Sequence, residues 1–288
     1  MTGEALALVF GAAAIHAAWN ALAKRGRDQF VFLWCAVSVA SVVLLPIGLL
    51  TAGGARVPSA AIPFLVGTIL IHAVYFYALG RSYGAGDFSL VYPIARGLGV
   101  ALVPILALVL FHEALSPLGT VGVALVVTGI VVLQLRPELW RALERRPERL
   151  GAGTGWALVT GVSIALYSVV DKGGVRVMHP VPYIALMGAG MSVLLLPAVL
   201  RRRAALRREW AVNWRPILVA STLNLTSYLL VLFAFRMSKV GYVVAAREIS
   251  IVLSVLIGSL WFGEGRLGLR LVAAAIVLSG VACVAVAR

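Results

Sequence analysis

The chain has 288 residues, of which 61% are hydrophobic and 12% are charged. So few charged side chains cannot cover the surface of a soluble domain, and a mean hydropathy of +1.00 is typical of membrane proteins. The net charge of +14 would indicate nucleic-acid binding in a soluble protein. In a membrane protein an excess of Lys and Arg keeps loops in the cytoplasm, so we expect the chain to lie in a lipid bilayer and to bind no nucleic acid.

Apolar runs of about 20 residues, the length of a helix that crosses a bilayer, recur along the sequence. They predict ten membrane-spanning helices, at residues 4–24, 30–51, 59–81, 88–111, 116–135, 153–172, 181–200, 215–236, 240–262 and 267–287. The long polar insert at residues 136–151 is interpreted as a cytoplasmic linker between residues 1–135 and residues 152–288. We therefore expect an all-α polytopic membrane protein with two five-helix halves.

Most of the 25 Lys and Arg residues fall in the loops after the first, third, fifth, seventh and ninth predicted spans. By the positive-inside rule these loops are cytoplasmic, which places both termini on the non-cytoplasmic side of the cell (inner) membrane. The two cysteines, Cys35 and Cys283, lie in apolar runs. We therefore expect no disulfide framework, no metal site and no cofactor.

The second half of the chain repeats landmarks of the first half at a constant offset of 151 residues. The matching residues are Arg96 and Arg247, Glu113 and Glu264, and Gly129 and Gly280. Five spans per repeat is an odd number, so the second repeat is expected to enter the membrane inverted relative to the first. Inverted repeats are typical of transporters whose substrate site lies near the bilayer midplane, between the halves.

With ten spans in two repeats, the chain resembles the EamA-type transporters of the drug/metabolite transporter superfamily. Each repeat has a glutamate at the end of its fourth span, Glu113 or Glu264, ahead of a glycine-bearing fifth span. The resemblance implies a secondary carrier with a central cavity, commonly an exporter of amino acids or other small metabolites. It implies neither an enzyme nor an ATPase, and the sequence has no GxxxxGK[ST] phosphate loop. The pattern from His16 to Lys24 also resembles a subgroup associated with phosphonate-utilisation genes.

Two arginines lie well inside predicted spans, where an ionisable group is costly and needs a reason. Arg96 and Arg247 are counterparts in the two repeats, and both are candidates for binding an acidic group of a substrate. A guanidinium can hold a carboxylate or a phosphonate through two parallel hydrogen bonds. The alternative is internal pairing, in which Glu248 neutralises Arg247 and carbonyl groups near Pro93 receive Arg96.

Polar and aromatic residues at helical spacing in the other spans extend the candidate substrate site. They are Trp19, Asn20, Tyr75, Tyr92, Tyr167, Asn224 and Tyr228. Their rings can stack on a substrate or on an ammonium group, and the alternative for each is packing. The candidates for proton coupling are His16, His72 and Glu248, because histidine titrates near neutral pH and a buried carboxyl group can hold a proton. Asp171 and Lys172 are expected near a membrane interface.

The leading hypothesis is export of a small anionic or zwitterionic substrate, such as an amino acid, by alternating access in a monomer or a homodimer. An aminophosphonate is an alternative through the subgroup resemblance. An exporter of lipophilic cations would need a negative cavity, which a single deep acid, Glu248, disfavours. A membrane-embedded enzyme lacks support because the sequence shows no catalytic motif. A non-transporting scaffold would leave the duplicated arginines without a role.

Overall fold

A computed structural model describes residues 1–23, 26–51, 57–85, 88–134, 147–253 and 267–287. Every element in this described part is a helix. The elements are α1 (Gly3–Ala23), α2 (Gln29–Thr51), the short 3₁₀ turn η1 (Ser59–Ala61), α3 (Ile62–Ala85), α4 (Phe88–Phe111), α5 (Pro117–Gln134), α7 (Pro147–Val177), α8 (Pro180–Leu200), α9 (Arg203–Met237), α10 (Val240–Arg247) and α12 (Leu267–Val286).

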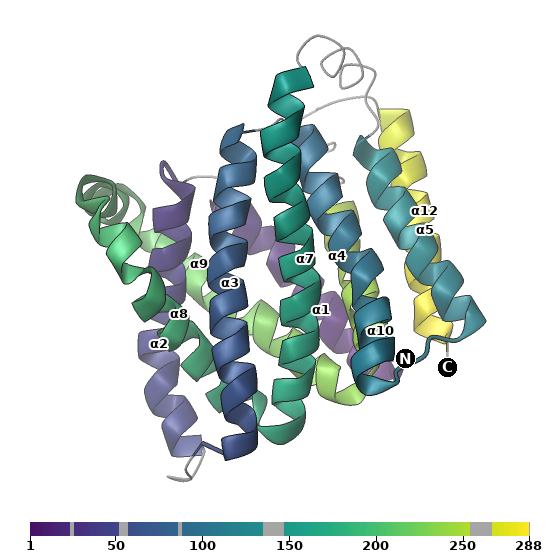
Figure 1. The fold of residues 1–288 in the computed structure, drawn as a ribbon, viewed down its shortest axis with the longest axis horizontal. Helices are drawn as coiled ribbons and strands as arrows, with labels where there is room; N and C mark the ends of the chain where they lie inside the picture. The colour runs from purple at the N-terminus through teal and green to yellow at the C-terminus, as the bar shows by residue number, and fades with distance from the viewer. Residues whose placement is uncertain (24–25, 52–56, 86–87, 135–146, 254–266, 288) are drawn as a thin grey trace.

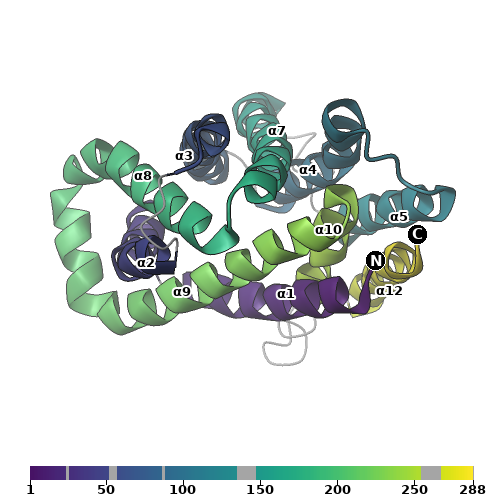
Figure 2. The same cartoon turned by 90° about the horizontal axis from the view of Figure 1, so that it is seen from below.

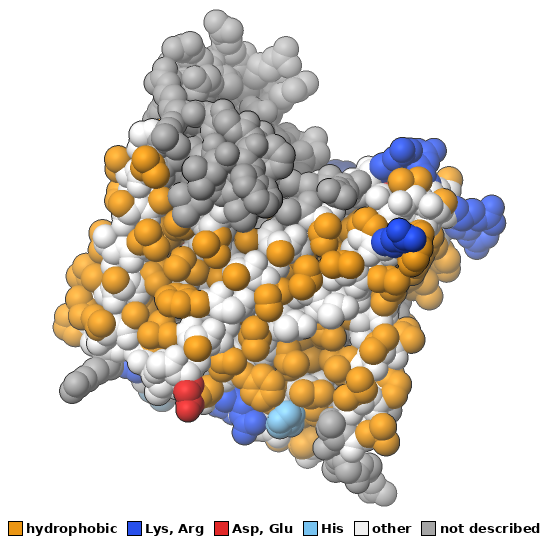
Figure 3. All heavy atoms as spheres, turned by 180° about the vertical axis from the view of Figure 1, so that it is seen from behind, with side chains coloured by type: hydrophobic (Ala, Val, Ile, Leu, Met, Phe, Trp, Pro, Cys, Tyr) orange, Lys and Arg blue, Asp and Glu red, His pale blue; other side chains and the backbone are white. Residues whose placement is uncertain are grey.

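Six helices of the described part are long and apolar enough to cross a membrane. They contain the segments Gln29–Gly48, Ser59–Leu79, Ile94–Phe111, Gly153–Val177, Pro180–Leu200 and Arg203–Met237. Two shorter apolar helices cover Pro117–Val132 and Leu271–Val286. Figure 3 shows the corresponding surface, where hydrophobic side chains cover most of the described face and Lys and Arg gather at its edges. The predicted class, an all-helical polytopic membrane protein, is confirmed.

The helices stand side by side, with α5 and α12 at one edge and α2 and α8 at the other (Figures 1 and 2). Between these edges, α7 packs against α3 and α4, and α1 packs against α9 and α10. α10 also contacts α4 directly. The centre of the bundle is therefore lined by α1, α3, α4, α7, α9 and α10.

The seam between α5 and α12 is built from glycines whose backbones touch. A Cβ atom added at Gly122 would lie 2.8 Å from the carbonyl oxygen of Gly280, and a Cβ added at Gly280 would lie 2.6 Å from that of Gly122. Further along the seam, a Cβ at Gly129 would lie 3.1 Å from the carbonyl oxygen of Ala273. Small residues let membrane helices approach this closely, so the seam is fixed by residue size.

Helix α9 is longer than the predicted span at 215–236 because its first turns continue the polar segment that we expected to be a loop. The two parts meet at a kink, where Asn213 has φ −117° and ψ 19°. Pro216 follows three residues later, and a proline ring disrupts the helix one turn before it. The amide of Asn213 donates a 2.7 Å hydrogen bond to Glu209, which stabilises the bend.

Two other boundaries differ from the prediction. Helix α7 already begins at Pro147, so residues 147–151 of the predicted linker are helical. The predicted span at 240–262 is interrupted, since α10 ends at Arg247 and a turn at Glu248 precedes further helix up to residue 253. At this turn the backbone N–H of Glu248 bonds to the carbonyl of Ala245 at 3.1 Å, three residues back instead of four. The interruption lies at the centre of the bundle.

Candidate functional site

A buried ion pair between α4 and the end of α10 lies at the centre of the site. Arg96 donates to both carboxylate oxygens of Glu248, from Nε to Oε2 at 3.2 Å and from Nη2 to Oε1. The two side chains are 11% and 2% exposed, respectively. This arrangement corrects the expected internal pairing, because Glu248 neutralises Arg96 and not its neighbour Arg247. A bidentate bond of this kind fixes both side chains and joins the two halves of the chain.

Arg247, the last residue of α10, points instead toward α1 and α9. Its Nη2 lies 3.3 Å from Nδ1 of His16, and its guanidinium carbon lies 5.9 Å from the centre of the Tyr228 ring. Its Nε atom is buried and has no hydrogen-bond partner in the described part of the chain. No described carboxylate lies within ion-pair distance of it. Arg247 therefore adds to the centre a positive charge that no described carboxylate contacts directly.

His16 is held by donors on both sides. The indole N–H of Trp19 donates to His16 Nδ1 at 3.2 Å, and the guanidinium of Arg247 approaches the same nitrogen. Since both neighbours are donors without acceptor capacity, Nδ1 must be the unprotonated acceptor of the ring. Asn20, by contrast, uses its amide locally and donates to the backbone carbonyl of His16 at 2.8 Å. The predicted cluster on α1 is thus brought together, with His16 and Trp19 facing Arg247.

An aromatic group from α3, α7 and α9 lies beside this cluster. The His72 ring stacks on Tyr167 at 4.3 Å between centroids, and Tyr75 and Tyr228 meet them edge-on at 5.6 to 6.4 Å. His72 Nδ1 lies 3.0 Å from the hydroxyl and from the carbonyl of Thr68, so its position is fixed from within α3. The structure therefore brings four of the predicted residues into one group.

Two predicted residues contribute less. Asn224 lies on α9 one turn before Tyr228 and is partly buried, and its side chain makes no hydrogen bond with the described residues. Tyr92 belongs to α4, but its side chain lies outside the described part of the structure. The prediction for Glu264 also falls outside the described residues.

Asp171 on α7, which the sequence suggested near a membrane interface, also belongs to the candidate site. Its side chain is fully buried by the surrounding helices. It accepts hydrogen bonds from the hydroxyl of Tyr183 at 2.8 Å and from the hydroxyl of Tyr228, whose ring neighbours Arg247. No described cation lies within ion-pair distance of Asp171. A signal was present in the sequence, since Asp171 falls one helical turn after Tyr167.

The buried Lys172 and the partly buried Glu113 stabilise the turn between α9 and α10. The ammonium of Lys172 donates to the carbonyls of Phe235 and Ser238, the latter at 2.7 Å, at the carboxyl end of α9. Glu113 accepts from the backbone N–H of Val240 at 2.9 Å, the first residue of α10, and lies 3.4 Å from Lys172. These contacts make Glu113 a helix-connecting residue.

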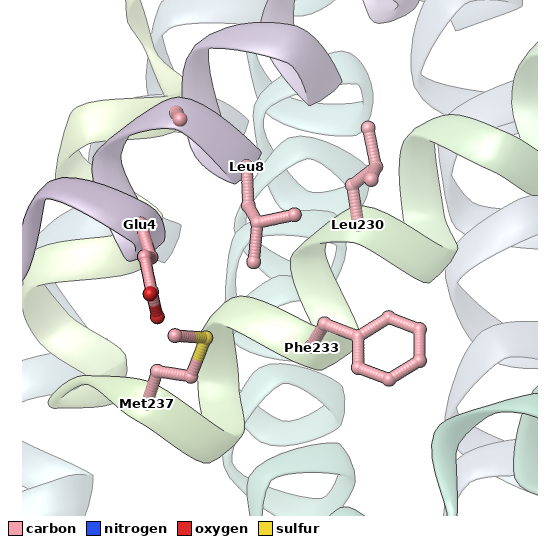
Figure 4. A pocket seen from close by; sticks show the side chains of 6 residues that line it. Glu4, Leu8, Leu230, Phe233 and Met237 are labelled. Carbon is pink, nitrogen blue, oxygen red and sulfur yellow. The ribbon is translucent and has the colours of Figure 1, made fainter.

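A separate groove opens on the outside of the bundle, between α1 and α9. It has a volume of about 520 Å³ and is lined by Glu4, Ala7, Leu8, Leu230, Phe233 and Met237 (Figure 4). Its lining is apolar except for Glu4, and it shares no residue with the central group. In a membrane protein, lipid tails can fill a groove of this composition, so we do not assign the site here.

Comparison with known proteins places this arrangement in a family. Residues 151–286 match the EamA-like transporter family. A multidrug transporter of Pseudomonas aeruginosa is 27% identical over 104 residues, which are 36% of this chain and 91% of that protein. A protein of known crystal structure has the same fold, with a TM-score of 0.74 over 99% of this chain and 98% of the other at 18% identity. The resemblance noted in the sequence is confirmed for the second half of the chain, where residues 151–286 match an EamA-like transporter domain, and the helices fit a multi-pass membrane protein.

Proposed function

We propose that the protein is a secondary transporter that exports a small metabolite carrying a carboxylate, such as an amino acid, through a central site between its two halves. The observation that carries this proposal is the partly buried guanidinium of Arg247, whose Nε atom is fully buried and has no partner among the described residues. Arg96 and Glu248 neutralise each other, whereas the contacts of Arg247 among the described residues are with a histidine and a tyrosine ring. A buried charge without a partner is costly, and a substrate anion would remove that cost.

The groups around Arg247 also suit the other end of a zwitterion. The faces of Tyr75, Tyr167 and Tyr228 can accept an ammonium group through cation–π attraction. Asp171 lies behind Tyr228 and supplies negative charge through the tyrosine hydroxyl. An amino acid would thus place its carboxylate at Arg247 and its ammonium group toward Tyr228 and Asp171. Trp19, Asn20, Tyr92 and Asn224 complete the proposed site.

The proposed mechanism is alternating access between two inverted five-helix repeats, residues 1–135 and 152–288, joined by a cytoplasmic linker at 136–151. The packing supports this symmetry, because α3 packs on α7 as α9 packs on α1. The α5–α12 seam shows the same reciprocity. At an offset of 151 residues, Gly122 corresponds to Ala273 and Gly280 corresponds to Gly129. Gly122 contacts Gly280, and Gly129 contacts Ala273. Reciprocal contacts are what a twofold axis between the halves produces.

The proposed topology has ten spans, with both termini on the non-cytoplasmic side of the inner membrane. The ends of the described chain lie together, since the amino group of Met1 donates to the carbonyls of Ala285 and Ala287 at 3.0 and 2.9 Å. The polar start of α9 carries a cluster of arginines, which the positive-inside rule assigns to the cytoplasm.

Proton coupling is proposed through His16, with His72 and Glu248 as the other candidates. Protonation of His16 at Nδ1 would remove the acceptor that Trp19 and Arg247 share and would repel the guanidinium. Arg247 would then be free to turn toward a substrate. Glu248 is less suited to exchange a proton while Arg96 holds both of its oxygens.

The test is uptake of labelled amino acids and phosphonates into vesicles that contain the purified protein, with and without a pH gradient. Arg247→Gln should lower kcat/KM for carboxylate substrates by about 10- to 100-fold, the worth of hydrogen bonds to a charged group. As a control, Arg215→Gln removes an exposed arginine of α9 that lies 13 residues before Tyr228, and it should leave transport unchanged. Equal transport by wild type and Arg247→Gln would reject the proposed anion site.

A second candidate, export of lipophilic cations, is favoured by one observation that the sequence did not offer. Asp171 is a fully buried acid beside the central group, and it accepts hydrogen bonds from the hydroxyls of Tyr183 and Tyr228. The Pseudomonas relative is named a multidrug transporter. If this candidate is right, Asp171→Asn should abolish transport of a lipophilic cation such as tetraphenylphosphonium, and Arg247→Gln should not.

A further inference from the structure

We propose that the substrate carboxylate occupies the place of an acidic side chain that the first half of the chain lacks, next to Gly97, and forms there a second arginine–carboxylate pair with Arg247. This inference rests on the proposed function and specifies where and how the substrate is recognised. It predicts a single carboxylate as the recognised group, held opposite the resident pair of Arg96 and Glu248.

The two halves of the chain carry matching residues at a constant offset. At the offset of 151 residues, Arg96 corresponds to Arg247, and Gly97 corresponds to Glu248. A twofold axis that relates the halves converts the contact between Arg96 and Glu248 into a contact between Arg247 and residue 97. The resident pair is therefore half of a symmetric motif whose other acid is missing, because residue 97 is glycine.

The surroundings of Gly97 agree with a missing side chain. Gly97 is buried in α4, yet a Cβ atom added to it would meet no described atom within 4 Å. Glycines nearby are packed differently. A Cβ at Gly99 would lie 2.9 Å from Cβ of Ile164, and one at Gly161 would lie 2.9 Å from the carbonyl oxygen of Ala95. Glycine is thus required for close helix packing at residues 99 and 161, whereas at residue 97 no described atom lies where a side chain would begin.

Arg247 has the donors that such a carboxylate needs. Its guanidinium carries five N–H groups, and within the described residues one nitrogen makes a 3.3 Å contact with His16. Its Nε is buried without a partner. In the resident pair, Arg96 uses Nε and one Nη to hold Glu248. Arg247 can offer the same two-donor edge to a ligand.

The charge balance selects a carboxylate over a doubly charged group. Within the described residues, Glu248 pairs with Arg96, whereas the positive charge of Arg247 has no carboxylate in contact, since Asp171 reaches it only through Tyr228. A single carboxylate removes that charge and matches the bidentate geometry of a guanidinium. A dianionic phosphonate would leave one negative charge buried, which is costly. The site should therefore prefer amino acids to aminophosphonates.

The experiment supplies the missing acid within the chain. In Gly97→Glu the new side chain should pair with Arg247 and exclude the substrate carboxylate, whereas Gly97→Gln has the same size without the charge. We expect Gly97→Glu to lose affinity for the labelled amino acids by at least about 100-fold relative to Gly97→Gln. Its melting temperature in detergent should also exceed that of Gly97→Gln by several degrees, and Arg247→Gln in the Gly97→Glu background should remove this difference. Gly97→Asp, a smaller acid, serves the same purpose if Gly97→Glu does not fold.

The outcomes separate this inference from the proposed function. If wild type transports amino acids but Gly97→Glu and Gly97→Gln behave alike in transport and in melting, the missing-acid assignment is wrong and the proposed function stands. If wild type transports no carboxylate, yet Gly97→Glu is stabilised in an Arg247-dependent manner, the paired geometry is right and the proposed function is wrong. Loss of transport only in the acidic variants, together with their stabilisation, supports both.

Discussion

The ion pair of Arg96 and Glu248 makes a quantitative prediction about stability. Replacing Glu248 with Gln keeps the size of the side chain but leaves the guanidinium of Arg96 without a counter-charge. Because the two side chains are 11% and 2% exposed, solvent screens the pair little. Breaking a buried pair by removing one partner costs about 3–5 kcal/mol. At about 2–4 °C per kcal/mol for a chain of this size class, Glu248→Gln should lower the melting temperature by about 6–20 °C.

Thermal unfolding of the purified protein in detergent, followed by tryptophan fluorescence, measures this effect. A double-mutant cycle with Arg96→Gln isolates the interaction, since the double variant removes both charges together. The double variant should be destabilised less than the sum of the two single variants, by about 2 kcal/mol or more. If the two single variants cost less than about 1 kcal/mol each and their effects add, the pair is not the buried contact described above.

Three further predictions concern stability and use the same unfolding assay. His112→Gly should stabilise the protein by about 0.5–1 kcal/mol, because His112 has φ 55°, which glycine adopts without strain; a lower melting temperature would contradict this. Gly280→Ala should lower the free energy of unfolding by about 1–3 kcal/mol, since the new Cβ meets the α5 backbone at 2.6 Å. Gly155→Ala, with open space around it, should be neutral or stabilising. Effects of the same sign and size would refute the seam geometry. Asp171→Asn and Tyr228→Phe should each destabilise and should couple by about 1–2 kcal/mol in a double-mutant cycle, and strict additivity would mean that the hydrogen bond between them contributes nothing.

The helical class could be predicted because it depends on the local composition of the chain. A run of about 20 apolar residues in a bilayer has no alternative to a helix, whatever its neighbours are. Boundaries that depend on a single residue were harder to predict. The kink at Asn213 joins a polar helix to a span, and the turn at Glu248 interrupts an apolar run without any glycine or proline at that point. In both cases hydropathy changes too gradually to show where the backbone departs from a helix.

The candidate site could be predicted as a set of residues but not as a set of contacts. Depth within a span singled out Arg96, Arg247 and Glu248, because a charge in the membrane must have a partner. Which arginine Glu248 pairs with is decided by the packing of α4 against α10, between residues 152 positions apart. The contacts of Asp171 could not be predicted for a similar reason. Its position near the end of a span suggested an interface, whereas α8 and α9 cover it with two tyrosines.

The glycine seam between α5 and α12 has a consequence for how the protein can be assembled. Under the offset of 151 residues, Gly122 on Gly280 and Gly129 on Ala273 are one contact made twice, which is the property of an isologous interface between identical subunits. Two copies of one half could therefore meet through the same surface that joins the two halves here. Residues 1–134 and 147–288 produced as separate chains should accordingly associate in the membrane, and a bulky residue in place of Gly122 should prevent it.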